Sequence, residues 1–211
     1  IEELDIAQMN LIRALALSNK YSEDNSVSLS AMQNLAALLT QKGNFVEAEE
    51  IYLNLIKIGK NNNKENSVSF ARVLNNLAVL YKKQCKYNLA YPYISKAINI
   101  WKNLSSSDYS NFAAAFHNQG ELYKAQGKYI LAIESFKNGI SILDISIDNF
   151  YEQYIEQSYS LINLYLKMGK KEESKNLLDI VNIIRSDRGE TNITLENLPD
   201  EIYEECSSSN I

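Results

Sequence analysis

The sequence predicts an all-α fold, a solenoid of antiparallel helix pairs, and three observations support this prediction. Glycine and proline are scarce, at 7 and 2 of 211 residues, so the frequent tight turns of an all-β protein lack the residues that form them. Hydrophobic residues make up 45% of the chain, which is enough for a packed core. A short turn recurs every 42 residues, at Gly43, Cys85, Gly127 and Gly169.

The residues around these turns repeat at the same interval, which indicates that each helix pair packs in the same way. Small side chains before and after a turn let the two helices of a pair approach closely. One pair cannot bury both of its apolar faces, so several pairs must stack. The aligned positions are Ala36, Ala78, Gly120 and Ile162 before the turns, and Ala48, Ala90, Ala132 and Ser174 after them.

Helical periodicity predicts one leading helix over residues 2–19, followed by four helix pairs. Residues 1–20 are expected to be the second helix of a truncated repeat, because this helix has no partner before it. The linkers between pairs contain Ser, Asn and Asp, which cap helix N-termini. The pairs span 27–60, 66–104, 108–144 and 148–186, with helices over 27–42, 45–60, 66–84, 87–104, 108–126, 129–144, 148–168 and 171–186.

The C-terminal part of the sequence departs from the repeat pattern. Ile162 replaces a small residue and Ser174 an alanine, so the fourth pair is expected to pack more loosely, as terminal repeats do. The last 25 residues hold seven acidic side chains and one Arg, and Pro199 argues against a long helix there. The sequence therefore predicts a repeat array over residues 1–186 and an acidic tail over residues 187–211.

Charge, hydropathy and cysteine usage exclude several classes of function. The net charge is −5 and the acidic tail accounts for it, so the repeats lack the basic excess that nucleic-acid binding requires. No apolar run approaches the roughly 20 residues that cross a bilayer, so no membrane contact is expected. Cys85 and Cys206 lack the spacing of a metal site, so we predict no disulfide and no zinc. A reducing, cytoplasmic location follows.

Catalytic motifs are scarce. The sequence contains one histidine, His117, and no Ser or Cys nucleophile is predicted beside it. No glycine-rich loop that cradles phosphate and no calcium-loop spacing occurs. We therefore predict no catalytic residue, no metal and no cofactor, and an enzyme is the least expected class.

The repeat resembles the tetratricopeptide repeat family over about residues 1–186. The usual repeat of that family has 34 residues, whereas the 42-residue repeat here is similar to those of kinesin light chains. The resemblance implies a right-handed superhelix whose first helices line a concave groove. It also implies a peptide ligand that carries an aromatic residue or Leu among acids. The matching residues are Leu77, Ala78, Tyr81, Tyr87 and Ala90.

One position of the first helices carries asparagine three times, at Asn34, Asn76 and Asn118, and Ser160 follows in the fourth repeat. An Asn side chain offers a donor and an acceptor, which suits the backbone of an extended peptide. It suits equally a hydrogen bond within the repeat that orients the next helix, and the two roles are compatible.

Neighbouring positions of the same helices complete the predicted peptide-binding groove. Its lysines fit an acidic ligand, although a solvated helix face is the plain alternative. The predicted groove residues are Asn34, Asn75, Asn76, Val79, Lys82, His117, Asn118, Glu121, Lys124, Tyr159, Asn163 and Lys167.

The sequence therefore predicts a non-catalytic module that binds a protein or peptide in its groove, as an adaptor or scaffold. The alternative is a structural subunit that assembles through its convex face or its end caps. Residues 198–205 combine apolar and acidic side chains, so we hypothesise that this segment docks in its own groove or in that of a neighbouring chain. That docking would allow self-association. A short capping helix or an unstructured tail is the competing interpretation.

Overall fold

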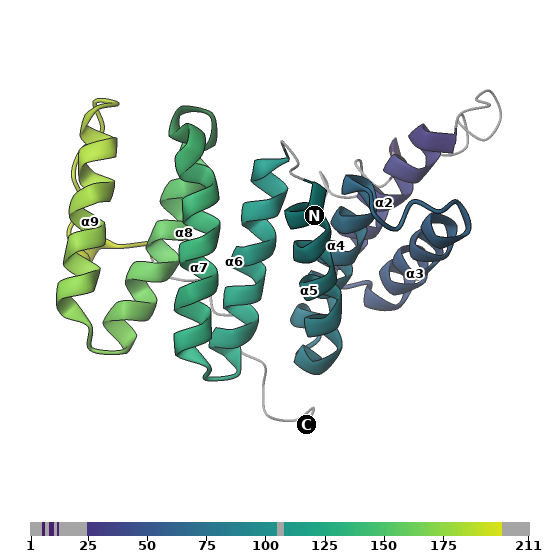
Figure 1. Cartoon of the computed structure of the whole chain (residues 1–211), viewed down its shortest axis with the longest axis horizontal. Helices are drawn as coiled ribbons and strands as arrows, with labels where there is room; N and C mark the ends of the chain where they lie inside the picture. Colours follow the sequence, from purple (N-terminus) through teal and green to yellow (C-terminus); the bar gives the residue numbers. More distant parts are fainter. Residues whose placement is uncertain (1–5, 7–8, 11, 13–24, 105–107, 200–211) are drawn as a thin grey trace. The chain divides into compact units, whose positions relative to one another are not determined.

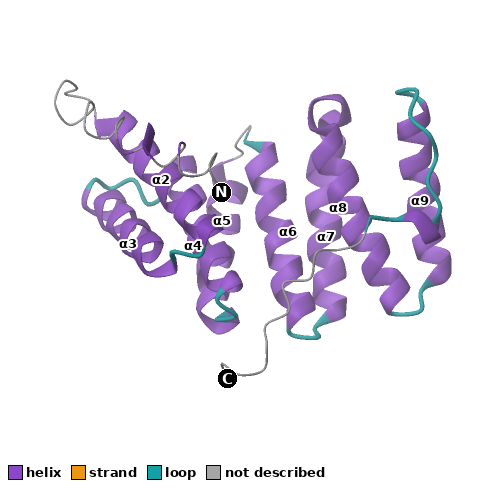
Figure 2. Ribbon diagram, turned by 180° about the vertical axis from the view of Figure 1, so that it is seen from behind, coloured by secondary structure: helices purple, strands orange, loops and turns teal. Residues whose placement is uncertain are grey.

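The computed structural model of the chain is all-α, as predicted. The described residues form helices joined by short loops, and they include no strand (Figures 1 and 2). The predicted leading helix over residues 2–19 lies outside the described residues, apart from isolated helical positions. The structure describes residues 6, 9–10, 12, 25–104 and 108–199.

The chain divides into two compact units, residues 1–106 and 107–211, and each is described by itself. Each unit contains two antiparallel helix pairs (Figure 1). The first unit holds α2 (Asn25–Lys42), α3 (Phe45–Asn61), α4 (Val68–Lys83) and α5 (Tyr87–Leu104). The second holds α6 (Tyr109–Ala125), α7 (Tyr129–Leu143), the 3₁₀ helix η1 (Asp144–Ser146), α8 (Ile147–Lys167), α9 (Lys171–Ser186) and the 3₁₀ helix η2 (Leu195–Asn197).

From residue 25 onward, the helices of the described residues end within two residues of the positions expected from the sequence. The start of α4 illustrates why small differences occur. Ser67 adopts an extended conformation, and its hydroxyl accepts a hydrogen bond from the Phe70 backbone N–H (3.2 Å). This N-cap begins the helix at Val68 rather than at residue 66.

All four turns inside the pairs end the first helix with the same hydrogen bond. The Asn44 backbone N–H donates to the Leu39 carbonyl oxygen at 2.9 Å, and this bond recurs in the other three turns. It closes the helix around a residue with positive φ, which glycine adopts without steric cost. The φ values are 85° at Gly43, 61° at Cys85, 71° at Gly127 and 72° at Gly169.

Small residues bring the helices of each pair together, as the sequence predicts. Ala36 and Ala48 are fully buried where α2 meets α3. Gly120 faces Phe136, and a Cβ atom at this glycine would lie 2.5 Å from the ring. The Phe136 ring is itself fully buried, so glycine at position 120 makes room for an aromatic side chain from the next helix.

The fourth pair closes around its two exceptional residues. Ile162 and Ser174 are both fully buried. The Ser174 hydroxyl donates to the Lys170 carbonyl oxygen at 2.9 Å. The buried hydroxyl, which the alanines of the other repeats lack, therefore has a hydrogen-bond partner. The expected looser packing is therefore not seen at these two positions.

Two further features concern single residues of the first unit. Trp101 of α5 is 1% exposed, which agrees with the packing role expected of a helical tryptophan. Cys85 is disulfide-bonded, so the prediction of no disulfide is wrong at this residue. The only other cysteine in the sequence, Cys206, lies outside the described residues.

No helix in the described part of the chain is both long and apolar enough to cross a membrane.

Candidate functional site

A small pocket lies in the first unit where α2, α3 and α4 meet. Its volume is about 110 Å³. Two of its lining residues, Asn76 and Val79, belong to the predicted groove. We call it the first-unit pocket, and it is lined by Ala37, Thr40, Gln41, Tyr52, Asn76, Val79 and Lys83.

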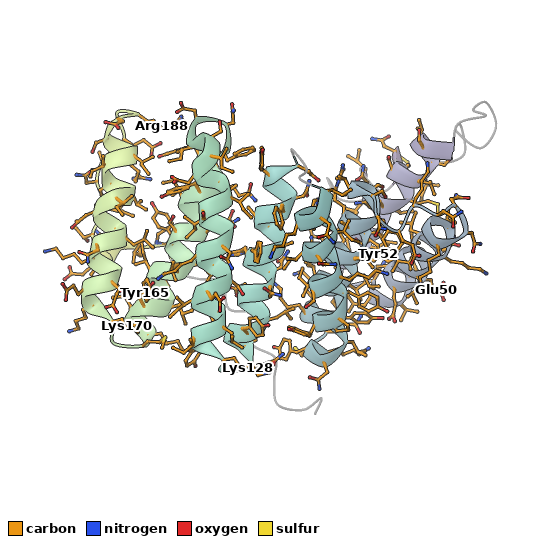
Figure 3. All side chains as sticks on the ribbon, viewed as in Figure 1. Glu50, Tyr52, Lys128, Tyr165, Lys170 and Arg188 are labelled. Atoms are coloured by element: carbon orange, nitrogen blue, oxygen red, sulfur yellow. The ribbon has the colours of Figure 1, made fainter. Side chains whose placement is uncertain are left out.

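Tyr52 of α3, labelled in Figure 3, is one of the residues that line the first-unit pocket. Its side chain is 1% exposed, and burial raises its pKa from 10.0 to about 12. Hydrogen bonds with Thr40 and Asn76 oppose this rise. The Tyr52 hydroxyl therefore links α2 and α4, and its bond with Asn76 joins the first helix pair to the second rather than lying within one repeat.

The other predicted groove residues of the first unit differ in exposure. Asn34 is exposed on α2, and Lys82 is half-buried on α4. Asn75 is only 6% exposed, and its Nδ2 donates to Oδ1 of Asn76 at 3.3 Å. Asn75 is thus placed to orient Asn76 rather than to meet a ligand. Successive residues of a helix point about 100° apart, so Asn75 does not face the same surface as Asn76.

In the second unit, a histidine joins the two first helices. His117 Nε2 of α6 lies 3.1 Å from Ser160 Oγ of α8, which is hydrogen-bonding distance. The imidazole ring also packs against Phe136 of α7, with ring centroids 5.3 Å apart. Ser160 holds the fourth place in the asparagine series, and its partner His117 comes directly before Asn118, the third member.

Glu121 and Lys124 form an ion pair one turn further along α6. Their closest atoms are 2.7 Å apart, and the side chains are 22% and 9% exposed. The Lys124 ammonium group also lies 5.9 Å from the centre of the Phe136 ring. Because its charge is compensated and largely covered, Lys124 does not offer the free cation expected of an anion clamp.

The remaining predicted residues of the second unit lie on α6 and α8. Tyr159 is half-buried, and its hydroxyl accepts a hydrogen bond from Arg185 of α9 at 3.3 Å. Burial raises the pKa of Tyr159, and the Arg185 charge opposes this rise. Asn118 and Asn163 are half-buried, and Lys167 is exposed with its ammonium group 5.5 Å from the Tyr129 ring centre.

Sequence reasoning missed Tyr52 and Thr40 in the first unit and Arg185 in the second. Tyr52 had a detectable signal, because the residues one, two and three repeats later are all apolar: Ile94, Phe136 and Leu178. A polar aromatic residue in that series indicates a hydroxyl with a buried partner. Arg185 had no such signal, since its contacts involve residues outside the repeats.

The described residues offer chemistry for binding rather than for holding a metal. No group of three or more His, Cys, Asp or Glu side chains gathers within that part of the chain. The first-unit pocket instead combines apolar walls with the Asn76 amide and the Lys83 ammonium group.

Solved structures share this fold at low sequence identity, which shows the fold alone. BtubC (BKLC) from P. vanneervenii matches with a TM-score of 0.76 and 19% identity, over 97% of this chain and 82% of that chain. A Podosopora anserina protein described as a kinesin light chain with nearly identical TPR-like repeats matches with a TM-score of 0.67 and 18% identity, over 90% of both chains. A Rap protein complexed with Competence and Sporulation Factor matches with a TM-score of 0.68 and 17% identity, over 87% of this chain and 51% of that chain.

Sequence comparison gives the family. Among curated proteins, none matches the chain. Two family models, both described as tetratricopeptide repeat, match residues 28–66 and 69–144, which together make up more than half of the 211 residues. Their boundaries follow the helix pairs and the 42-residue period described above. The chain belongs to the tetratricopeptide repeat family.

Proposed function

We propose that this protein is a non-catalytic interaction module that binds an extended segment of a partner protein against its first helices. The first-unit pocket is the observation that carries this proposal. It is an apolar hollow of about 110 Å³, flanked by a polar amide, on the helices that carry the asparagine series. The family is a non-catalytic repeat fold, and its members act in protein interactions.

The chemistry of the pocket suggests the kind of segment that it would take. Ala37 and Val79 line its apolar walls, which fit one medium-sized aliphatic side chain. Asn76 lines the same pocket, and its amide is suited to a hydrogen bond with the backbone beside that side chain. We therefore propose an extended ligand with an apolar residue at the pocket, and, as the resemblance to kinesin light chains implies, with acids beside this residue.

The cellular role follows the same proposal. A module that captures one segment of a partner protein suits an adaptor or scaffold. The Rap protein of similar fold was solved with a bound factor, which supports a binding role for the array.

The test compares partners of the chain with those of an Asn34→Ala, Asn76→Ala, Asn118→Ala variant. The matched control is Asn54→Ala, Asn99→Ala, Asn138→Ala, which removes three exposed asparagines from second helices. Pull-downs from lysate are read by mass spectrometry. Partners recovered with the wild-type chain should be lost with the first variant and kept with the control. Equal recovery with both folded variants would contradict the proposal.

A scaffold subunit that assembles through its second helices is the alternative function. It is favoured by large apolar side chains exposed on these helices, such as Val46 at 75% and Ile130 at 67%. Under this alternative, Val46→Ser or Ile130→Ser should dissociate the assembly, while the groove asparagines have no effect. Docking of residues 198–205 in the groove, and self-association through it, stay predictions because residues 200–211 lie outside the described residues.

A further inference from the structure

Residues 190–198, which we call the strap, run back along α9 as a loop that contains the single 3₁₀ turn η2. The Asn182 side chain of α9 holds its centre with two hydrogen bonds. Nδ2 donates to the Ile193 carbonyl oxygen at 2.9 Å, and Oδ1 accepts from the Ile193 backbone N–H at 3.0 Å. One side chain thus pairs with both backbone groups of a single residue, which is how an amide recognises an extended peptide.

Arg185, one turn further along α9, holds the start of the strap. Its guanidinium group donates to the Thr191 carbonyl oxygen at 3.1 and 3.2 Å and pairs with the Glu190 carboxylate at 2.9 Å. The same group reaches the Tyr159 hydroxyl on α8. Asn182 and Arg185 therefore bind an acidic residue and the backbone of the residues that follow it.

Apolar contacts complete the attachment of the strap. Ile193, Leu195 and Leu198 pack against the core of the second unit, yet each stays only half-buried. Between them, Thr194 and Glu196 are exposed. The strap is held by side chains of α9 and not by the backbone hydrogen bonds of a sheet or a long helix. Segments attached in this way open locally at low free-energy cost.

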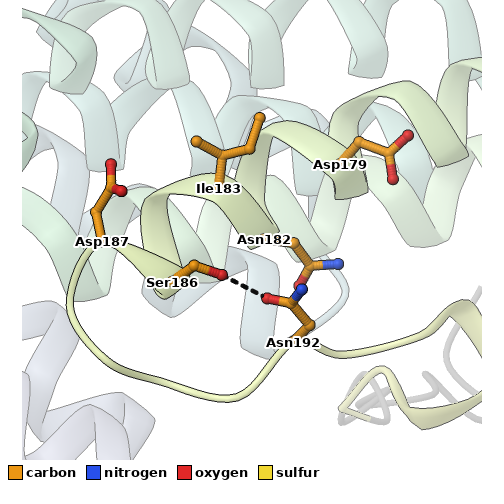
Figure 4. A pocket seen from close by; sticks show the side chains of 6 residues that line it. All are labelled: Asp179, Asn182, Ile183, Ser186, Asp187 and Asn192. Carbon is orange, nitrogen blue, oxygen red and sulfur yellow. Dashed lines mark hydrogen bonds between the residues drawn. The ribbon is translucent and has the colours of Figure 1, made fainter.

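The surface under the strap is incompletely covered. A hollow of about 380 Å³ lies beside it, lined by Ile183 and Asp179 of α9 and by Asn192 of the strap (Figure 4). Ile183 is 63% exposed there. A segment with a larger apolar side chain at this point would bury surface that the strap leaves in water.

The strap also stands where another repeat would begin. Moving α8 forward by the 42-residue period gives residues 189–209, so the strap occupies the register of a further first helix. In the earlier pairs, a helix at this position packs on the preceding pair, as α4 does on α3. Here the strap, a loop with the single 3₁₀ turn η2, packs on α9 instead.

We propose that α8 and α9 form a second peptide-binding site, separate from the first-unit pocket, which the strap occupies until a partner protein displaces it. The partner segment begins with an acidic residue and carries apolar residues three and five positions later, as the strap does. This site lies outside the proposed groove, and its test does not depend on the asparagine series.

The test uses a fluorescein-labelled peptide with the sequence of residues 190–199 and the full chain. Ile193→Ser with Leu195→Ser weakens the strap without changing the α9 side chains that hold it, so this variant should bind the peptide at least tenfold more tightly than the wild type. Adding Asn182→Ala should then weaken binding at least fivefold. The control is Asn176→Ala, which removes an exposed asparagine of α9 away from the strap contacts. Equal binding by the wild-type and strap-weakened chains, or no effect of Asn182→Ala, would show that the strap is only a structural cap.

Two measurements on the wild type keep the proposal testable if the strap variant does not fold. In hydrogen exchange, the Ile193 amide should exchange at least a hundredfold faster than buried amides of α8, because a displaceable strap opens locally. Equal protection would overturn the proposal. Light scattering should show a monomer, and a dimer that the strap substitutions dissociate would identify the occupant as a second copy of this chain instead.

Discussion

Gly120 shows how one residue sets the distance between two helices. The Phe136 ring stands where a Cβ atom of residue 120 would be, with ring atoms at 2.5, 2.6 and 3.0 Å. Such distances are shorter than carbon atoms can approach without a shift. The ring cannot move away freely, because Phe136 is fully buried and also packs against the His117 ring.

Gly120→Ala should therefore destabilise the second unit by about 1–2 kcal/mol, since overpacking outweighs the better helix propensity of alanine. Urea denaturation measures this change. In a Phe136→Leu background, the same substitution should be neutral or stabilising, because the smaller side chain frees the space. An equal loss in both backgrounds would place the cause elsewhere than in the ring contact.

Tyr52 gives the first unit a defined response to alkaline pH. Its pKa is near 12 in the folded chain and 10.0 when unperturbed, so the folded protein keeps a proton that the unfolded chain has lost between these values. Its contribution to stability is complete below pH 10 and disappears as pH rises through 12, a loss of about 2–3 kcal/mol.

Tyr52→Phe should be less stable at pH 7 by about 1–2 kcal/mol, because Thr40 and Asn76 lose a buried partner. Above pH 10 the difference should shrink and then reverse, since phenylalanine has no proton to lose. Denaturation at a series of pH values checks this. A constant difference across the series would show that Tyr52 does not titrate in this way.

At this scale the sequence predicted packing better than polar contacts. Ala36, Ala48 and Gly120 could be identified because they recur in register, and every recurrence adds support. Asn76 was found by the same logic, and its partner Tyr52 was not, because a hydrogen bond between two helices depends on geometry that a single residue series does not contain.

The turn between the helices of a pair is the element that repeats most faithfully. Four turns share the bond from a backbone N–H to the carbonyl five residues earlier, at 2.9 Å each time. At Gly127 a Cβ atom would meet nothing within 4 Å, so only the backbone conformation restricts this position. The turns could be predicted from their spacing, because each needs only one residue that adopts a positive φ and no specific contact with distant side chains.

Gly127→Ala should cost about 1 kcal/mol, because a φ of 71° is unfavourable for a residue with a Cβ atom. Gly127→Asn should cost clearly less, since asparagine tolerates this conformation better. Thermal denaturation of the two variants under the same conditions gives the comparison. Equal losses would indicate a steric rather than a conformational cause.

The strap is the element that the sequence did not predict. Pro199 and the loss of periodicity correctly argued against a long helix there. Nothing local indicated that the segment would return to α9, because its position depends on Asn182 and Arg185 rather than on its own propensity. The alternation of Ile193, Thr194 and Leu195 is the only sequence signal, and it is too short to be decisive.

Across the whole chain, stability should be distributed over two units. Repeat proteins gain stability from each repeat and its neighbours, so a local change spreads only as far as the contacts carry it. Residues 1–106 and 107–211 each form their own compact unit. Gly120→Ala should therefore speed hydrogen exchange in α6 to α9 and leave α2 to α5 nearly unchanged. Faster exchange throughout would show that the units unfold together.

The sequence contains a single tryptophan, and its buried position in α5 gives the molecule a natural optical probe. Fluorescence excited selectively at the indole reports on the first unit alone, whereas the circular dichroism signal sums the helices of both. The two unfolding curves will therefore separate wherever the units differ in stability, without any label. Partner binding to either unit becomes distinguishable by which of the two curves it shifts.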